Sequence, residues 1–260
     1  MQVINNTGAQ SGGGIQNDGT LTLTNVTLAN NSTASQTGVG GGLFTSDFAI
    51  AHLNGVTVSS NTASDSAGIH NDGTMDLTNV TISGNTATST SAGGLRNNNS
   101  ATLKNVTIAS NTAPAGCAGG LNTPGGPTNL TNTIIGNDAP QDCVGVTITS
   151  LGSNIDSDGT CGLAGPGDRS NVDPGLGSLA NNGGPTETHA LLAGSPAIDH
   201  GTSCPPPSTD QRGMTRPKDG DNNGTSVCDI GAVETSFPPP TTSTSTSTSS
   251  TTTTTMGGCK

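Results

Sequence analysis

One motif in this sequence has the residue types and spacing of a metal site. The run is Asp219-Gly220-Asp221-Asn222-Asn223-Gly224, which places side-chain oxygens at positions 1, 3 and 5 and a glycine at position 6, as at the start of a calcium loop. Position 12 is Ile230, so the glutamate that normally binds calcium through both oxygens is missing. A structural calcium ion held by Asp219, Asp221 and Asn223 and a polar hairpin loop both remain open interpretations.

A second candidate for chemistry is the pair His70 and Arg96. They occupy equivalent positions of an internal repeat and are expected about 5 Å apart if the repeats stack. Polysaccharide lyases and hydrolases need paired carboxylates, or Asp-bound calcium with a basic side chain, on one face. We expect no carboxylate to align with this pair, and there is no Trp or Tyr to hold a sugar ring. We therefore predict no catalytic or cofactor-binding residues, with a carbohydrate-active enzyme as the alternative.

Six cysteines are present, and their spacing does not match a metal site. Cys143 and Cys161 flank one loop, and Cys204 and Cys228 flank another, which indicates two local disulfides in an exported protein. The sequence alone does not choose among the possible connectivities.

The elements that position these residues come from a repeat. Two small residues followed by an aliphatic residue recur at a spacing of 28 and then 26 residues, marked by Ile15, Leu43, Ile69, Leu95 and Leu121. Self-similarity at this period predicts a stack of similar units. The second half of each unit alternates apolar and small polar residues, as in Leu103-Lys104-Asn105-Val106-Thr107-Ile108. This alternation favours short strands, so we predict an all-β protein, a right-handed parallel β-helix of about five to six coils.

Stacking equivalent positions predicts what faces the interior. Three columns are aliphatic, and a fourth is a structural asparagine ladder of Asn31, Asn61, Asn85 and Asn111, continued by Asn6 and Asn137. A column of Thr27, Thr57, Thr81 and Thr107 is expected to face outward. An ice-binding surface is therefore a minor alternative, although the neighbouring outward positions are irregular.

The repeat also divides the chain. We expect coils over residues 1–140, with a bulging loop from Phe44 to Ala51, and an irregular cap over residues 141–235. Short apolar pieces of the cap, such as Ala190-Leu191-Leu192, are expected to plug the open end of the core. Residues 236–260 are rich in Pro, Thr and Ser and are expected to form a disordered tail.

Composition excludes several classes of function. The net charge of −11 argues against nucleic acid and against anionic membrane surfaces. No apolar stretch is long enough to span a membrane. Only 28% of residues are hydrophobic, which a β-helix tolerates because each coil needs only a thin core. The first residues fit the end of a coil, so we expect the natural chain to extend further toward an export signal.

The predicted cap carries a distinctive series of motifs. They are Asp173-Pro174-Gly175-Leu176-Gly177, Asn182-Gly183-Gly184-Pro185-Thr186, Gly194-Ser195-Pro196-Ala197-Ile198-Asp199, Asp210-Gln211-Arg212-Gly213, Arg216-Pro217 and Cys228-Asp229-Ile230-Gly231-Ala232-Val233-Glu234. With the coils before it, this series resembles the choice-of-anchor Q domain, a bacterial family of exported β-helix proteins with varied surface-sorting signals. The coils also resemble the repeats of chlamydial polymorphic membrane proteins.

These resemblances imply a secreted or cell-surface protein with a display or adhesion role, and they supply no catalytic residues. We therefore predict a non-enzymatic adhesion or envelope-structural module. Its partner, a protein or a glycan, and its oligomeric state stay open.

Overall fold

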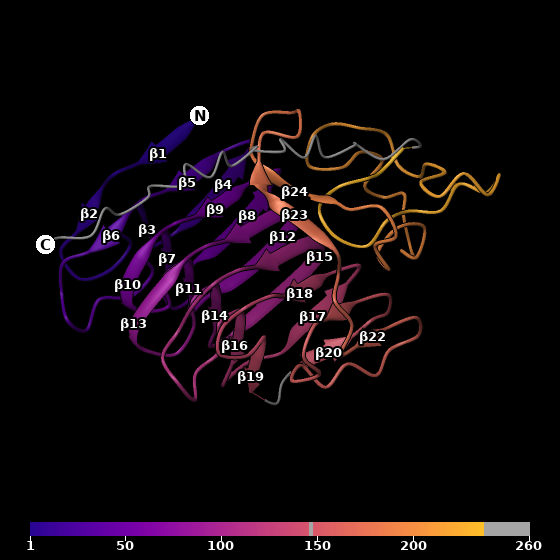
Figure 1. Cartoon of the computed structure of the whole chain (residues 1–260). Helices are drawn as coiled ribbons and strands as arrows, with labels where there is room; N and C mark the ends of the chain where they lie inside the picture. Colours follow the sequence, from indigo (N-terminus) through magenta and orange to yellow (C-terminus); the bar gives the residue numbers. More distant parts are fainter. Residues whose placement is uncertain (146–147, 237–260) are drawn as a thin grey trace, which may run out of the picture.

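The computed structural model describes residues 1–145 and 148–236, and these form a stack of parallel β-coils without any helix (Figure 1). The predicted all-β class and the parallel β-helix are confirmed. The predicted tail, apart from Ser236, lies outside the described residues.

Three parallel sheets run along the stack. The six-stranded sheet, which has one strand for each coil, consists of β3 (Ile15–Asn17), β7 (Leu43–Thr45), β11 (Ile69–Asn71), β14 (Leu95–Asn97), β16 (Leu121–Thr123) and β19 (Cys143–Gly145). The four-stranded sheet consists of β2 (Thr7–Gly8), β6 (Ser32–Thr33), β10 (Thr62–Asp65) and β13 (Thr86–Thr90).

The largest sheet has twelve strands and is called the long sheet below. It consists of β1 (Gln2–Ile4), β4 (Thr20–Thr24), β5 (Thr27–Ala29), β8 (Ile50–Asn54), β9 (Thr57–Ser59), β12 (Thr74–Ser83), β15 (Ser100–Ala109), β17 (Thr128–Thr131), β18 (Ile134–Gly136), β20 (Ile148–Ser150), β21 (Ile155–Asp156) and β22 (Arg169–Ser170). Its parallel pairing continues to Ser170, so shorter, less regular coils extend past the predicted boundary at residue 140.

The interior is lined by the aliphatic columns that the repeat predicts. Ile69 pairs in register with Leu43 and Leu95. In the same way Leu77 pairs with Leu53 and Leu103, and Ile82 with Val58 and Ile108. All nine side chains are buried. Because each coil stacks the same small aliphatic residues on those of its neighbour, a narrow core suffices for a chain with so few hydrophobic residues.

A buried asparagine column runs beside this core. Both the backbone N–H and the Nδ2 of Asn85 donate to Oδ1 of Asn111, at 3.0 and 2.9 Å. The same amide donates to the carbonyl of Val58 at 3.0 Å. Asn31 and Asn61 repeat this arrangement, and Asn6 donates to Asn31 at the first coil. The column therefore satisfies the backbone at the same bend in successive coils.

At its other end the column finishes on Asp138, and the expected continuation through Asn137 is wrong. Oδ1 of Asp138 accepts the backbone N–H and the Nδ2 of Asn111 at 2.6 and 2.9 Å. Asn137 is exposed instead, because the interval from Asn111 is 27 residues at this coil and the inward position falls one residue later.

Asp138 makes the end of the column sensitive to pH. Burial raises its pKa well above the ordinary value, and its Oδ2 is buried without a hydrogen-bond partner. A carboxyl whose pKa is raised in the folded state destabilises the fold as pH rises from the unfolded pKa toward the folded one. The folded protein is therefore not destabilised by this carboxyl in acid, where it is protonated. It loses stability as the pH rises toward neutral and the buried carboxyl must ionise.

We predict that Asp138→Asn raises the melting temperature at pH 8 and has a smaller effect at pH 4. The asparagine amide completes the column without an ionisable group. Thermal melts of both proteins at the two pH values check this prediction. An equal shift at both pH values, or no shift at pH 8, would contradict it.

Residues 172–235 fold back along the outer face of the long sheet, so the expectation that Ala190-Leu191-Leu192 plugs the open end of the core is wrong. Residues 172–235, called the cap below, include the antiparallel pair β23 (Leu176–Ala180) and β24 (Thr188–Leu191), drawn in orange against the purple strands in Figure 1. The cap has its own apolar core against the sheet, made of Ile134, Ile155, Leu191, Ala197, Ile198, Ile230 and Val233. Ile134 and Ile155 supply this core because they point outward from β18 and β21.

The threonine column forms the docking surface for the cap. The Thr57 hydroxyl donates to the Glu187 carbonyl at 2.6 Å, and the Thr81 hydroxyl donates to Oε1 of Gln211 at 2.7 Å. Oγ1 of Thr107 accepts the backbone N–H of Ala232 at 3.0 Å. All three threonines are buried. The column does face outward from the long sheet, but the cap covers these three residues, so they do not form the exposed surface that the ice-binding alternative requires.

Two disulfides connect the pairs that the sequence indicates. Cys143 bonds to Cys161, and Cys204 bonds to Cys228. Cys117 is a free thiol among the described residues.

Candidate functional site

The loop with calcium-like spacing brings together a different set of oxygen-bearing side chains from the predicted one. Carboxylate oxygens of Asp199, Asp219 and Asp221 lie within 4.8 Å of one another. Oδ1 of Asn223 accepts the backbone N–H of Thr225 at 2.8 Å, and its amide donates to Asp221 at 2.9 Å. Spacing alone did not reveal Asp199, which comes from another part of the cap. Calcium binding at this loop stays a prediction.

A second acidic group, which sequence reasoning missed, lies between the last coils. Carboxylate oxygens of Asp142, Asp156 and Asp158 lie within 4.8 Å of one another. Burial raises the pKa of Asp142, while hydrogen bonds from Thr160 and from backbone N–H groups outweigh burial and lower the pKa of Asp158. Asp142 also accepts the backbone N–H and the hydroxyl of Ser157, at 2.6 and 2.7 Å. These contacts tie together consecutive turns of the stack.

The outer face of the six-stranded sheet carries the predicted pair of His70 and Arg96. The two residues are direct partners in β11 and β14, and Phe44 of β7 lies on the other side of His70 with ring centroids 5.5 Å apart. The expectation that no carboxylate aligns with the pair is wrong. Nη1 of Arg96 lies 3.1 Å from Oδ2 of Asp65, and Nε2 of His70 lies 3.0 Å from Oδ1 of Asp72. Both aspartates come from the segments that flank β11.

Six side chains close a ring of hydrogen bonds here, called the polar ring below: Asp65, Ser66, His70, Asp72, Arg96 and Asn98. Nε of Arg96 donates to Oδ1 of Asn98 at 2.8 Å, and Nδ2 of Asn98 donates to Asp72 at 2.6 Å. Ser66 donates to Oδ1 of Asp65 at 2.5 Å, and its hydroxyl also lies 3.1 Å from Nδ1 of His70. The hydrogen bond from His70 is the main reason that the pKa of Asp72 lies below its ordinary value.

Part of the polar ring has the composition of a hydrolytic triad, since Ser66, His70 and Asp72 are joined in series. In such a triad the serine hydroxyl must reach a substrate, and its histidine must accept the proton. Ser66 is 0% exposed and donates to Asp65, and His70 is only 6% exposed. These side chains therefore hydrogen-bond to one another, and little of their surface is accessible to a substrate.

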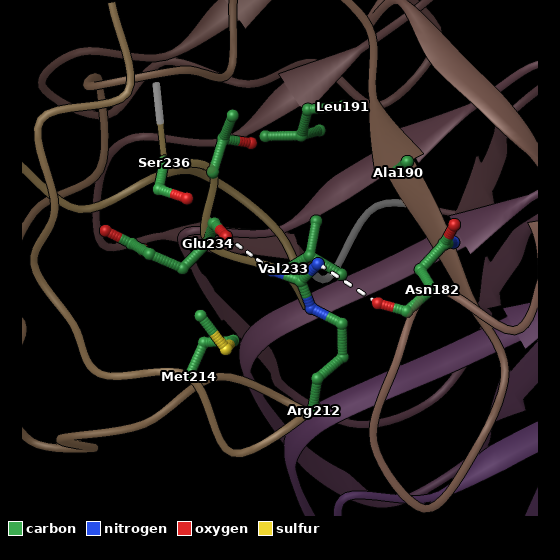
Figure 2. A pocket seen from close by; sticks show the side chains of 9 residues that line it. Asn182, Ala190, Leu191, Arg212, Met214, Val233, Glu234 and Ser236 are labelled. Atoms are coloured by element: carbon green, nitrogen blue, oxygen red, sulfur yellow. Dashed lines mark hydrogen bonds between the residues drawn. The ribbon is translucent and has the colours of Figure 1, made fainter. Parts of the chain in front are cut away.

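The cap contains a cavity lined by Asn182, Ala190, Leu191, Arg212, Met214, Val233, Glu234, Thr235 and Ser236 (Figure 2). Figure 2 shows the Arg212 guanidinium turned to the carbonyls of Asn182 and Glu234, and it also pairs with Asp210 at 2.7 Å. The Glu234 carboxylate points away from this cavity toward Arg216. The charged groups at this cavity are thus already neutralised by contacts within the cap.

A buried ion pair lies behind the cavity. Nη1 of Arg216 and Oε2 of Glu234 are 2.7 Å apart, and both side chains are 0% exposed. Arg216 also donates to the carbonyls of Asp229 and Gly231, at 3.0 and 2.7 Å. Burial raises the pKa of Glu234 to about 7 and that of Asp229 to about 6. These residues belong to the cap motifs quoted above, and they hold together the turns between Arg216 and Glu234.

Gln211 joins the cap to the coils. Its Nε2 donates to the hydroxyls of Thr57 and Thr186, both at 2.9 Å, and its Oε1 accepts from Thr81. One side chain thus links two coils to two separate segments of the cap. This part of the Asp210-Gln211-Arg212-Gly213 motif is a docking contact.

Comparison of the chain with models of protein families, with curated proteins and with solved structures finds no match. Among the described residues, no helix has the length and hydropathy needed to cross a membrane.

Proposed function

We propose that this chain is a non-enzymatic β-helix module of a secreted or cell-surface protein that recognises a partner through its outer surface, in adhesion or in the structure of the envelope. The observation that carries the proposal is the polar ring. Its charged and nucleophilic groups are bonded to one another, and its serine and histidine are buried. Catalysis needs such groups to be free to meet a substrate.

Two further observations support an exported protein of this kind. The disulfides Cys143–Cys161 and Cys204–Cys228 are typical of oxidising compartments. The cap motifs resemble those of the choice-of-anchor Q family, and their residues Gln211, Arg216 and Glu234 have docking and packing contacts in the fold. The contacts of these three residues stabilise the fold, as expected for a module whose role is to display a surface.

A carbohydrate-active enzyme is the second candidate, and one observation favours it. Two carboxylates, Asp65 and Asp72, lie beside His70 and Arg96 on one face of the β-helix. Acid–base cleavage of polysaccharides uses these residue types.

Turnover measurements separate the two candidates. We expect no turnover when the protein is screened against neutral and acidic polysaccharides, with reducing ends and unsaturated products as the readout. His70→Ala and Arg96→Ala are the test variants, and Lys104→Ala on the long sheet is the matched control. Turnover that is lost in both test variants and retained in the control would refute the non-enzymatic proposal.

A further inference from the structure

The second coil carries an insertion where its neighbours make a tight turn. Thr45 pairs with Asn17 and Asn71, and Ile50 pairs with Thr20 and Thr74. Residues 46–49, called the Phe48 turn below, therefore stand where each adjacent coil has only two residues. The extra length projects Phe48 into solvent, where it is 98% exposed.

The Phe48 turn is held at both ends by the backbone of neighbouring coils. Ser46 N–H donates to the Asn17 carbonyl at 3.0 Å, and Ile50 N–H donates to the Gly19 carbonyl at 2.7 Å. On the other side the Ala49 carbonyl accepts Thr74 N–H at 2.9 Å. A Cβ on Gly73 would lie 2.2 Å from that carbonyl oxygen, so the turn packs closely against the third coil. These contacts fix the position of Phe48 before any partner binds.

Phe48 contributes little to the fold that presents it. Its φ is +65°, a left-handed conformation that is unfavourable for a bulky side chain. Its ring gains almost no burial in return, because nearly the whole side chain is exposed. Glycine or asparagine would adopt this backbone conformation more easily. The apolar ring is thus free to contact the surface of a partner. Aromatic side chains often serve as such anchors in protein interfaces.

The turns stacked on either side of the Phe48 turn carry acidic residues. Asp18, Asp47 and Asp72 belong to the turns of three successive coils, and the first two are exposed. The pKa of Asp72 is lowered by its hydrogen bond to His70, which keeps this carboxylate ionised. The positive charge of Arg96, two coils further along the stack, is paired with Asp65. An exposed aromatic ring next to Asp47 in the chain, on a turn between other acidic turns, suits a cationic side chain, which can lie on the ring and pair with the acids.

We propose that the Phe48 turn is a docking site for a basic protein segment, one in which Lys or Arg lies next to an aliphatic or aromatic side chain. This inference rests on the proposed recognition function and names its site and partner chemistry. Phe48 binds the apolar side chain and the alkyl part of the basic residue, while Asp47 and Asp18 pair with its charge. Acidic polysaccharides are disfavoured because the same carboxylates repel them.

Synthetic peptides of about 12 residues test the site by isothermal calorimetry with the full chain. One contains Lys and Leu, the second Lys and Ser, and the third Glu and Leu. We expect the Lys/Leu peptide to bind at least about tenfold more tightly than the other two. Phe48→Ala should remove that advantage, and Asp47→Asn should weaken binding and reduce its dependence on salt. Leu151→Ala, at an exposed apolar residue of the last coils, is the control and should bind as the unaltered protein does.

Several outcomes overturn the inference. The inference is wrong if the Lys/Leu peptide does not bind, or if the Phe48→Ala variant binds it as tightly as the unaltered protein does. It is also wrong if affinity depends on peptide charge alone, so that the Lys/Leu and Lys/Ser peptides bind equally. Neutral and acidic oligosaccharides are measured in the same assay. If they bind in a Phe48-dependent manner and the peptides do not, the basic partner is wrong but a recognition function remains. Cleavage of those oligosaccharides would overturn the proposed function itself. Thermal melts verify that each variant is folded.

Discussion

Replacing Asn85 with leucine is expected to lower the free energy of unfolding by about 3–4 kcal/mol, because several buried groups lose their partners at once. Asn85 accepts the backbone N–H and the amide of Asn61 at 3.0 and 2.9 Å, and it donates to the Val58 carbonyl. All of these atoms lie inside the stack, where water does not replace the lost hydrogen bonds. Urea unfolding of both proteins measures the difference.

Asn122→Leu provides a control of the same residue type. Asn122 pairs with Arg96 and Val144 in the six-stranded sheet and is only partly buried, on the outer face. We expect its substitution to change stability by less than about 0.5 kcal/mol. Equal effects of the two substitutions would show that the asparagine column is not a source of stability.

Replacing Arg216 with methionine is expected to destabilise the cap by about 3–5 kcal/mol, because the Glu234 carboxylate would be left buried without its counter-charge. The coils do not contain this pair, so their unfolding should change less. Calorimetry should then resolve a cap transition at lower temperature, and limited proteolysis should cleave within residues 172–235 first.

The double variant Arg216→Met with Glu234→Gln separates charge from packing. Glutamine keeps an acceptor for the backbone N–H groups of Lys218 and Asp229 but carries no charge. We expect it to restore part of the lost stability. The carbonyls of Asp229 and Gly231 still lack the donor that Arg216 provides, so recovery should be incomplete. No recovery would show that the ion pair itself contributes little.

The repeat predicted the coils well because every coil imposes the same requirement on equivalent residues. Leu77 must be apolar since Leu53 and Leu103 lie directly beside it, and Asn85 must be polar since Asn61 and Asn111 bond to it. A periodic fold therefore records its contacts at a fixed interval of sequence.

The cap and the polar ring lack this property. Thr81 meets Gln211 across 130 residues, and no period connects them. The alternation of apolar and polar residues predicts that Thr81 faces outward. It does not predict whether an outward residue contacts solvent or another segment of the chain, because the sequence pattern is the same in the two cases. Asp65 and Asp72 were missed for a related reason. Asp65 ends β10 just after an irregularity in the strand register, and Asp72 lies in the turn after β11. At both positions regular alternation does not predict the direction of the side chain.

The central structural conclusion is that the cap lies along the threonine column of the long sheet, and amide hydrogen exchange tests it most directly. The backbone N–H of Gly231 donates to the Asn132 carbonyl at 2.9 Å, and that of Ala232 donates to Oγ1 of Thr107 at 3.0 Å. Both protons are protected only while the cap is docked on the coils. We predict exchange at these two residues far slower than in an unstructured peptide and accelerated by Arg216→Met. Fast exchange at both in the unaltered protein, with the coils still protected, would contradict the docked cap.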